Sequence, residues 1–264
     1  MQKTTLKEQG AKLPVPYEKL GDKLDFEFKP WKLKEEKEIG KLRKKQRHTS
    51  KFIREVFEYM LSNFGGQEWD SMDKREKKVL LNQMPYSNIL YMYIWLRYEA
   101  LGEEVKFTGF QCPSCGHEVK DFVGDLESLE IEIPEEDDKK KLYELKKPFR
   151  MGDVQVEGVY TVFTPWDVME TVTPGTSDAG TVKETFIRRS VVKVKTDLQD
   201  EADLNVVQLI ENLTKRDIEG LYEHISESNG GPNMGIELDC PACEYHMVKP
   251  LDWDFEVFFG SSSL

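Results

Sequence analysis

The chain lacks the sequence signals that mark most enzymes and membrane proteins. It has no Gly-rich phosphate loop, no GxSxG motif and no HExxH motif, and its four histidines are scattered. Its longest apolar run, Ile89 to Leu96, is far too short to cross a bilayer. The N-terminal residues are polar and lack the apolar stretch of a signal peptide. We therefore expect a non-enzymatic protein without a small-molecule substrate or a membrane segment, and one that no signal peptide exports.

Basic charge is scarce outside the first fifth of the chain. The 264 residues carry 37 Lys and Arg against 49 Asp and Glu, a formal net charge of -12. Residues 1–54 nevertheless hold 16 basic and 8 acidic residues, a net of +8, which leaves -20 for the rest. An arm that docks on an acidic surface has this pattern, and so has a solvated helix face. Because the apolar stripe over residues 33–46 is thin, we predict that residues 1–47 form an extended basic arm that binds a neighbouring subunit.

Aromatic residues are plentiful, and most of them follow a helical or a strand-like spacing. The 14 Phe, 10 Tyr and 5 Trp suffice for a hydrophobic core and exclude wholesale disorder. Residues 48–102 are predicted to be a helical region with three helices. The first ends at Phe64 before Gly65-Gly66, the second spans Asp73 to Met84, and the third spans Tyr86 to Leu101.

From Val105 onward the apolar period changes to that of short strands. We predict that residues 103–264 form a zinc-ribbon-like β module with an inserted α+β segment over residues 129–235, which makes the whole chain α+β. Within this segment, Thr164 and Thr214 each stand in an N-cap position before a predicted helix.

Cysteine is rare, and each of the four cysteines belongs to a CPxC pair. The pairs are Cys112-Pro-Ser-Cys115 and Cys240-Pro-Ala-Cys243, with 124 residues between them. Two such pairs complete a tetrahedral four-cysteine site, so we predict one structural Zn²⁺, with iron as the less favoured metal. The alternative is two redox or disulfide pairs, which a reducing compartment disfavours. A site with four sulfur ligands has no open position and is therefore structural rather than catalytic.

The residues that follow the two cysteine pairs differ. Gly116 follows the first pair, where backbone freedom helps N–H groups to point at sulfur, whereas Glu244 follows the second. We therefore expect the second turn to be less typical. His117 and His246 lie near the pairs and would act as ligands only if a cysteine failed, so we interpret them as surface residues.

Zinc ribbons often bind nucleic acid, but the local charge argues against that function here. Residues 103–128 hold six acidic residues and two lysines, and residues 237–258 hold six acidic residues and one lysine. Phosphate contacts require a basic face, so a nucleic-acid partner is unfavoured. A cytoplasmic zinc-ribbon protein that binds nucleic acid or regulates another protein remains the alternative function.

The C-terminal stretch alternates between aromatic or apolar and acidic residues. Trp253, Phe255, Val257 and Phe259 occupy one face of a predicted strand, and the other face is mostly acidic, with Asp252, Asp254, Glu256 and Phe258. This strand either docks into a partner protein or covers the small core of the zinc ribbon itself.

Several of these motifs together resemble a known family. They are Thr164-Pro165-Trp166-Asp167, the stretch Leu213 to Leu221, Gly230-Gly231-Pro232, the two CPxC pairs and the aromatic C-terminus. Through these motifs the chain is similar to the baseplate hub and tail-assembly proteins of contractile-tailed phages of the T4 type, although the resemblance does not extend to residues 1–100. It implies a non-enzymatic structural or assembly component that binds other phage baseplate, hub or tail proteins. It also implies a location in the virion or, during assembly, in the host cytoplasm.

Overall fold

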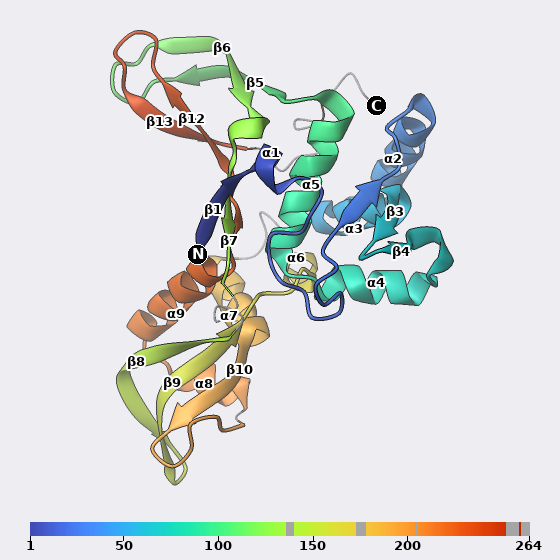
Figure 1. Ribbon diagram of the computed structural model, residues 1–264. Helices are drawn as coiled ribbons and strands as arrows, with labels where there is room; N and C mark the ends of the chain where they lie inside the picture. Colours follow the sequence, from blue (N-terminus) through green and yellow to red (C-terminus); the bar gives the residue numbers. More distant parts are fainter. Residues whose placement is uncertain (136–139, 173–177, 204, 252–258, 260–264) are drawn as a thin grey trace.

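The computed structural model describes residues 1–135, 140–172, 178–203, 205–251 and 259. Its α+β fold confirms the predicted class. Figure 1 shows an elongated molecule with a helical body in the middle, two β-hairpins at one end and a separate α+β lobe at the other. No helix in the described ranges is long and apolar enough to cross a membrane.

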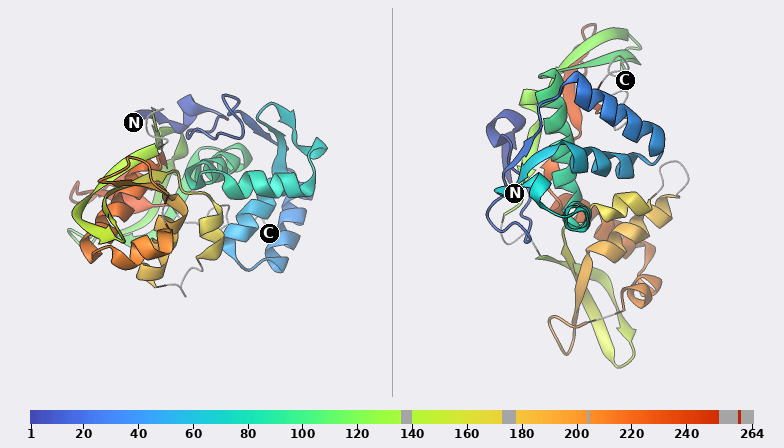
Figure 2. Two further views of the ribbon diagram at one scale, coloured as in Figure 1. Left: turned by 90° about the horizontal axis from the view of Figure 1, so that it is seen from below. Right: turned by 90° about the vertical axis from the view of Figure 1, so that its right-hand side faces the viewer.

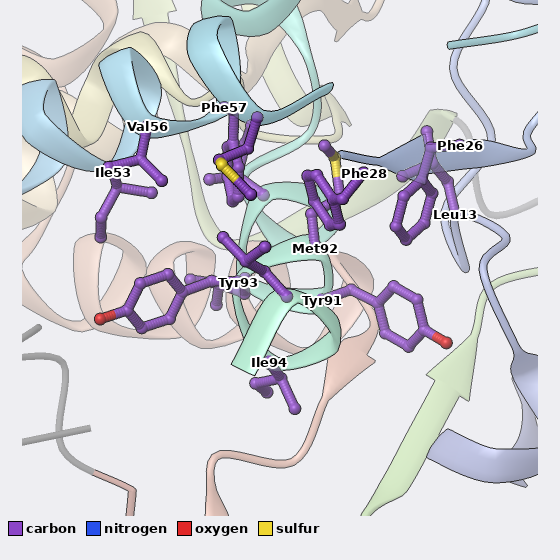
Figure 3. Packing of buried hydrophobic residues seen from close by; sticks show 14 of the residues in the cluster. Leu13, Phe26, Phe28, Ile53, Val56, Phe57, Tyr91, Met92, Tyr93 and Ile94 are labelled. Atoms are coloured by element: carbon purple, nitrogen blue, oxygen red, sulfur yellow. The ribbon is translucent and has the colours of Figure 1, made fainter. Parts of the chain in front are cut away.

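The helical body is built around α5 (Tyr86–Leu101). Ten of the 16 residues of this helix are buried, because apolar side chains cover nearly its whole circumference. Figure 3 shows Tyr91 and Met92 of α5 close to aromatic side chains of neighbouring elements. The surrounding helices are α2 (Leu33–Lys45), α3 (Thr49–Met60) and α4 (Lys74–Gln83), with a 3₁₀ turn at Trp69–Ser71.

One predicted helix is shorter than expected. Helix α3 ends at Met60, and the next residues form β3 (Leu61–Phe64), which pairs with β2 (Phe26–Phe28) and with β4 (Gln67–Glu68). Leu61 and Phe64 are buried in the strand, and a helix would bury the same two residues. The spacing of apolar residues therefore could not distinguish a longer helix from a helix followed by a strand. Gly65 and Gly66 both have positive φ and form the hairpin turn from β3 to β4.

Residues 1–47 do not form the predicted extended arm, and their contact with a neighbouring subunit stays a prediction. Strand β1 (Gln2–Thr5) joins a sheet, α1 (Leu6–Gln9) follows it, and Leu6, Leu13 and Phe26 are buried in the body. Asn88 of α5 accepts a hydrogen bond from the Val15 N–H (2.9 Å) and donates one to the Val15 carbonyl (2.8 Å). The buried residues are spaced irregularly along a charged segment, so neither composition nor periodicity revealed them. The basic stretch forms α2, whose Ile39 packs on the body while its lysines face outward.

The α+β lobe is inserted between two strands that lie side by side. It starts after β7 (Glu130–Ile133) and ends before β11 (Gly231–Pro232), and these strands form a sheet in the order β1-β7-β11. The lobe has its own antiparallel sheet, in the order β10-β9-β8, and its own hydrophobic cluster. Its elements are β8 (Lys140–Met151), β9 (Val154–Val162), α7 (Ala179–Ser190), β10 (Val191–Thr196), α8 (Val206–Asn212) and α9 (Lys215–Ser228). Helix α6 (Asp167–Thr171) belongs to the same insertion in sequence but packs on the helical body, whose core includes Trp166.

Thr164 attaches the lobe to the helical body rather than capping a helix. The N-cap of α6 is Trp166, so the predicted cap at Thr164 is wrong, whereas Thr214 does cap α9. The Thr164 carbonyl accepts a hydrogen bond from the Tyr86 N–H (2.9 Å). Its own N–H donates to Asn229 Oδ1 (2.8 Å), and its hydroxyl contacts Ser190 Oγ (2.7 Å). Because this fully buried residue needs partners for every polar group, its position depends on contacts distant in sequence.

The two remaining hairpins project from the other end of the body. The first consists of β5 (Glu104–Gln111) and β6 (Glu118–Asp125), followed by a 3₁₀ turn at Leu126–Ser128, and the second consists of β12 (Gly235–Asp239) and β13 (His246–Pro250). Both pair antiparallel, and Figure 1 shows the hairpins next to each other.

The predicted C-terminal interaction strand falls mostly outside the described residues, since Trp253, Phe255 and Val257 are not among them. Phe259 is described and is 2% exposed. Its ring stacks on Trp31 (centroids 5.3 Å apart) and meets Tyr93 edge-on (5.5 Å). Phe259 therefore belongs to the core of the helical body, not to the core between the hairpins.

Candidate metal centre

Each CPxC pair forms the turn of one hairpin, and the two turns have the same hydrogen bonds. In the first, the Cys112 N–H donates to the His117 carbonyl (2.9 Å) and the Gly116 N–H donates to the Cys112 carbonyl (2.9 Å). In the second, the Cys240 N–H donates to the Tyr245 carbonyl (3.0 Å) and the Glu244 N–H to the Cys240 carbonyl (2.8 Å). Each turn thus brings its two thiols to the same side.

The fifth residue of each turn adopts a left-handed backbone conformation. Gly116 has φ +72°, and Glu244 has φ +57°, the one positive φ of a non-glycine residue in the described part of the chain. The expectation that the second turn would be less typical is therefore wrong, because its backbone conformation matches that of the first turn. Glu244 adopts the same left-handed conformation as Gly116. This conformation costs free energy in any residue that carries a Cβ atom.

The four sulfur atoms lie at the corners of a compact group that spans the two hairpins. Cys112 Sγ is 3.8 Å from Cys243 Sγ, and Cys115 Sγ is 3.8 Å from Cys240 Sγ. All four Sγ atoms lie within 4.8 Å of one another, and all four thiols are free. Zn–S bonds of about 2.3 Å at tetrahedral angles separate sulfurs by roughly 3.8 Å, whereas a disulfide needs about 2.05 Å. The group therefore fits one metal ion and not two disulfides.

The electrostatics of the thiols require a cation if they are all to ionise. Burial opposes ionisation of Cys112, but hydrogen bonds from the backbone N–H groups of Cys115 and Ser114 lower its pKa to about 7. For Cys115, a backbone hydrogen bond at His117 favours the thiolate, yet contacts with the other thiols, Cys243 first, raise its pKa to about 12. Adjacent thiolates repel one another, so a bound divalent cation would supply the missing positive charge.

The hydrophobic core beside the sulfur group is small. It consists of Phe110, Val119 and Leu238, with half-buried neighbours around them. Cys112 and Cys240 are buried next to this core, and Cys115 and Cys243 are exposed. The hairpins thus meet through a small apolar cluster, the four sulfurs and the ammonium group of Lys249, which lies 5.1 Å from the centre of the Phe110 ring.

The nearby histidines stay outside the sulfur group, as expected. His117 and His246 are exposed. His246 Nδ1 instead lies 3.0 Å from Asp239 Oδ1 on the outer face of the second hairpin. Sequence reasoning missed this outer face, although the alternation of Ile236, Glu237, Leu238 and Asp239 could have indicated that the two carboxylates share it.

Comparison with known proteins gives one family. A family model described as T4 bacteriophage base plate protein matches residues 10–259. The match includes both cysteine pairs and also residues 10–100, which the sequence motifs did not connect with any family. No curated protein and no solved structure matches the chain.

Proposed function

The chain belongs to the T4 bacteriophage base plate protein family, and from this membership and the four-cysteine geometry we propose that it is a zinc-stabilised component of the baseplate hub region. The family places the protein in the tail baseplate of the virion and gives it a structural role. Membership in a family of structural proteins suggests that the chain has no enzymatic function. The hub location, the metal and the binding partners are the proposal.

The sulfur–sulfur distance of 3.8 Å between the two hairpins carries the proposal of a metal ion. Cys112, Cys115, Cys240 and Cys243 would hold one Zn²⁺, which would offset half of the charge of four thiolates and join the hairpins. Four protein ligands leave no position for a substrate or water, so the ion would serve stability alone. The proposed unit is the zinc-ribbon module of residues 103–264, with the lobe as its insertion.

Other baseplate, hub or tail proteins are the proposed partners. The surface of the two hairpins supports a protein partner over a nucleic acid, because Glu118, Asp121, Glu237 and Asp239 are all exposed there. These carboxylates would repel phosphate groups. Nothing in the described geometry favours the alternative of a nucleic-acid-binding regulator.

Complementation of a phage that lacks this protein tests the proposal. The test variant is Cys243→Ser, and the control is Ala242→Ser, which alters the same exposed turn without removing a ligand. We expect about one zinc per chain in wild type and control, and assembled tails from both. Cys243→Ser should bind zinc weakly and yield few complete baseplates. Normal tails from a zinc-free variant would refute the structural role of the metal. Absence of the wild-type protein from both tail-assembly intermediates and finished particles would refute the proposal that it is a component of the hub.

A further inference from the structure

The outward face of α2 carries a continuous basic stripe. Its lysines, Lys34, Lys37, Lys41 and Lys44, are spaced by three, four and three residues and are all exposed. Lys41 pairs with Glu38 of the same helix (2.6 Å), and the other three lysines form no ion pair within the described part of the chain. Leu33 lies at the start of the stripe and is 65% exposed. The opposite face of α2 packs on the body through Ile39.

The outer face of the β12–β13 hairpin has the complementary composition. Glu237 and Asp239 point away from the small core, and their side chains are 70% and 71% exposed. Val248 lies opposite Glu237 in the strand register and is 54% exposed. His246 stands beside the two carboxylates, so the face contains two negative charges, an imidazole and an exposed aliphatic side chain.

We propose that the basic stripe of α2 docks on the outer face of the β12–β13 hairpin of a second copy of this chain. Lysines would meet Glu237 and Asp239, and Leu33 would cover Val248. Each face combines an exposed aliphatic residue with charged side chains, and the charges of the two faces have opposite sign. The proposed partner is a second copy because every copy of the chain carries both the basic stripe and the acidic face.

The two faces lie on different sides of the molecule, which determines the kind of assembly. Figure 1 and the left view of Figure 2 place α2 and the β12–β13 hairpin on opposite sides of α5. A chain therefore cannot bring its own stripe to its own hairpin without unfolding. The contact would join unlike surfaces head to tail, and such contacts build rings or open filaments. The inference deepens the proposed baseplate role by naming a partner, and its test needs only the purified zinc-loaded protein.

Charge reversal tests the contact in both directions. The variants are Lys37→Glu with Lys44→Glu, Glu237→Lys with Asp239→Lys, and all four changes together. Lys74→Glu with Lys78→Glu is the control, because these lysines are exposed on the neighbouring α4. Molar mass is measured by light scattering over a range of protein concentrations, at low salt and at about 1 M salt, where the Debye length is about 3 Å. Zinc content confirms that the second hairpin is intact, and Glu237→Lys alone replaces the double change if Asp239→Lys releases the metal.

The proposal expects that wild type and control associate at low salt and dissociate at high salt. Each two-site reversal should weaken association at least tenfold, and the four-site variant should recover most of it. A wild-type protein that stays monomeric at every concentration would overturn the proposal. Two-site variants that still associate, or a four-site variant that does not recover, would overturn it as well and would assign the stripe to a different acidic partner. Because none of these results depends on phage particles, they leave the baseplate role to its own test.

Discussion

The helical body and the hairpin pair hold their strands and helices together in different ways. The body encloses a cluster of 32 buried hydrophobic residues, to which the N-terminal segment and Phe259 both contribute. The cluster that belongs to the hairpins alone has three such residues, and Val105 of β5 and Ile236 of β12 are buried in the cluster of the body. Hydrophobic burial stabilises the body by itself, whereas these few hairpin side chains, at about 1.5–3 kcal/mol each, do not offset the ordering of two hairpins. A metal ion held by the four cysteines would therefore stabilise the hairpins as the hydrophobic core stabilises the body.

Removal of the metal should produce the largest effect and should separate the two regions. Zinc in small structural sites contributes on the order of 10–16 kcal/mol, more than the hairpins can replace. After chelation, backbone amides of β5, β6, β12 and β13 should exchange rapidly with solvent, while amides of α5 stay protected. Hydrogen exchange measured by mass spectrometry reads both regions in one sample. Hairpins that stay fully protected in a metal-free protein would show that they do not depend on the ion.

Truncation in the body should have the next largest effect and the opposite distribution. Phe57 of α3 is fully buried and stacks on Phe28 (centroids 5.8 Å apart), so Phe57→Ala should destabilise the body by about 3–5 kcal/mol. The matched change Phe110→Ala falls in the small cluster between the hairpins and should leave the unfolding of α5 unchanged. Denaturant titration followed by far-UV circular dichroism, with added zinc held constant, measures both. Equal losses of α5 stability from the two variants would mean that body and hairpins unfold as one unit.

The same contrast explains which features the sequence could predict. The four cysteines were recognisable because a set of metal ligands consists of fixed residue types at fixed spacing. The hydrogen bonds that bring the two thiols of each pair together lie within the turn itself. Helices α4 and α5 were recognisable because their caps and apolar positions are local as well. The packing of residues 1–47 depends on contacts such as Asn88 with Val15, which join positions 73 residues apart. No local pattern in a charged segment predicts such a contact, and the same is true of the buried position of Thr164.

Acid should destabilise the body through a single histidine, with a smaller effect than either change above. His48 precedes α3, and its ring nitrogens are buried with no hydrogen-bond partner among the described residues. Burial lowers its pKa, the charge of Lys51 lowers it further, and Glu170 opposes both. Since the unfolded pKa is about 6.5, the unfolded state binds the proton first, and stability is complete above that pH. Stability should fall as the pH decreases from about 6.5 towards the lower folded pKa.

The variant His48→Gln removes this titration while keeping a side chain of similar size. Free energies of unfolding of the body, followed at α5 between about pH 7.5 and pH 5, should depend less on pH in the variant than in wild type. Acid also protonates the thiolates of the hairpins, and that effect should be the same in both proteins. Identical slopes for α5 in the two proteins would exclude His48 as the source.

The smallest effect should come from the one non-glycine residue with positive φ in the described chain, and it compares the two hairpins with each other. Glu244→Gly relieves the left-handed backbone at φ +57° and should stabilise the second turn by about 1 kcal/mol. The reciprocal change, Gly116→Ala, introduces the same strain into the first turn. A Cβ at Gly116 would meet no atom within 4 Å, so its cost would be that of the backbone alone. Competition with a zinc-binding dye should give roughly fivefold tighter binding for Glu244→Gly and roughly fivefold weaker binding for Gly116→Ala. If both variants bound zinc as wild type does, the turns would not limit the stability of the metal centre, and the small core between the hairpins would be the remaining determinant.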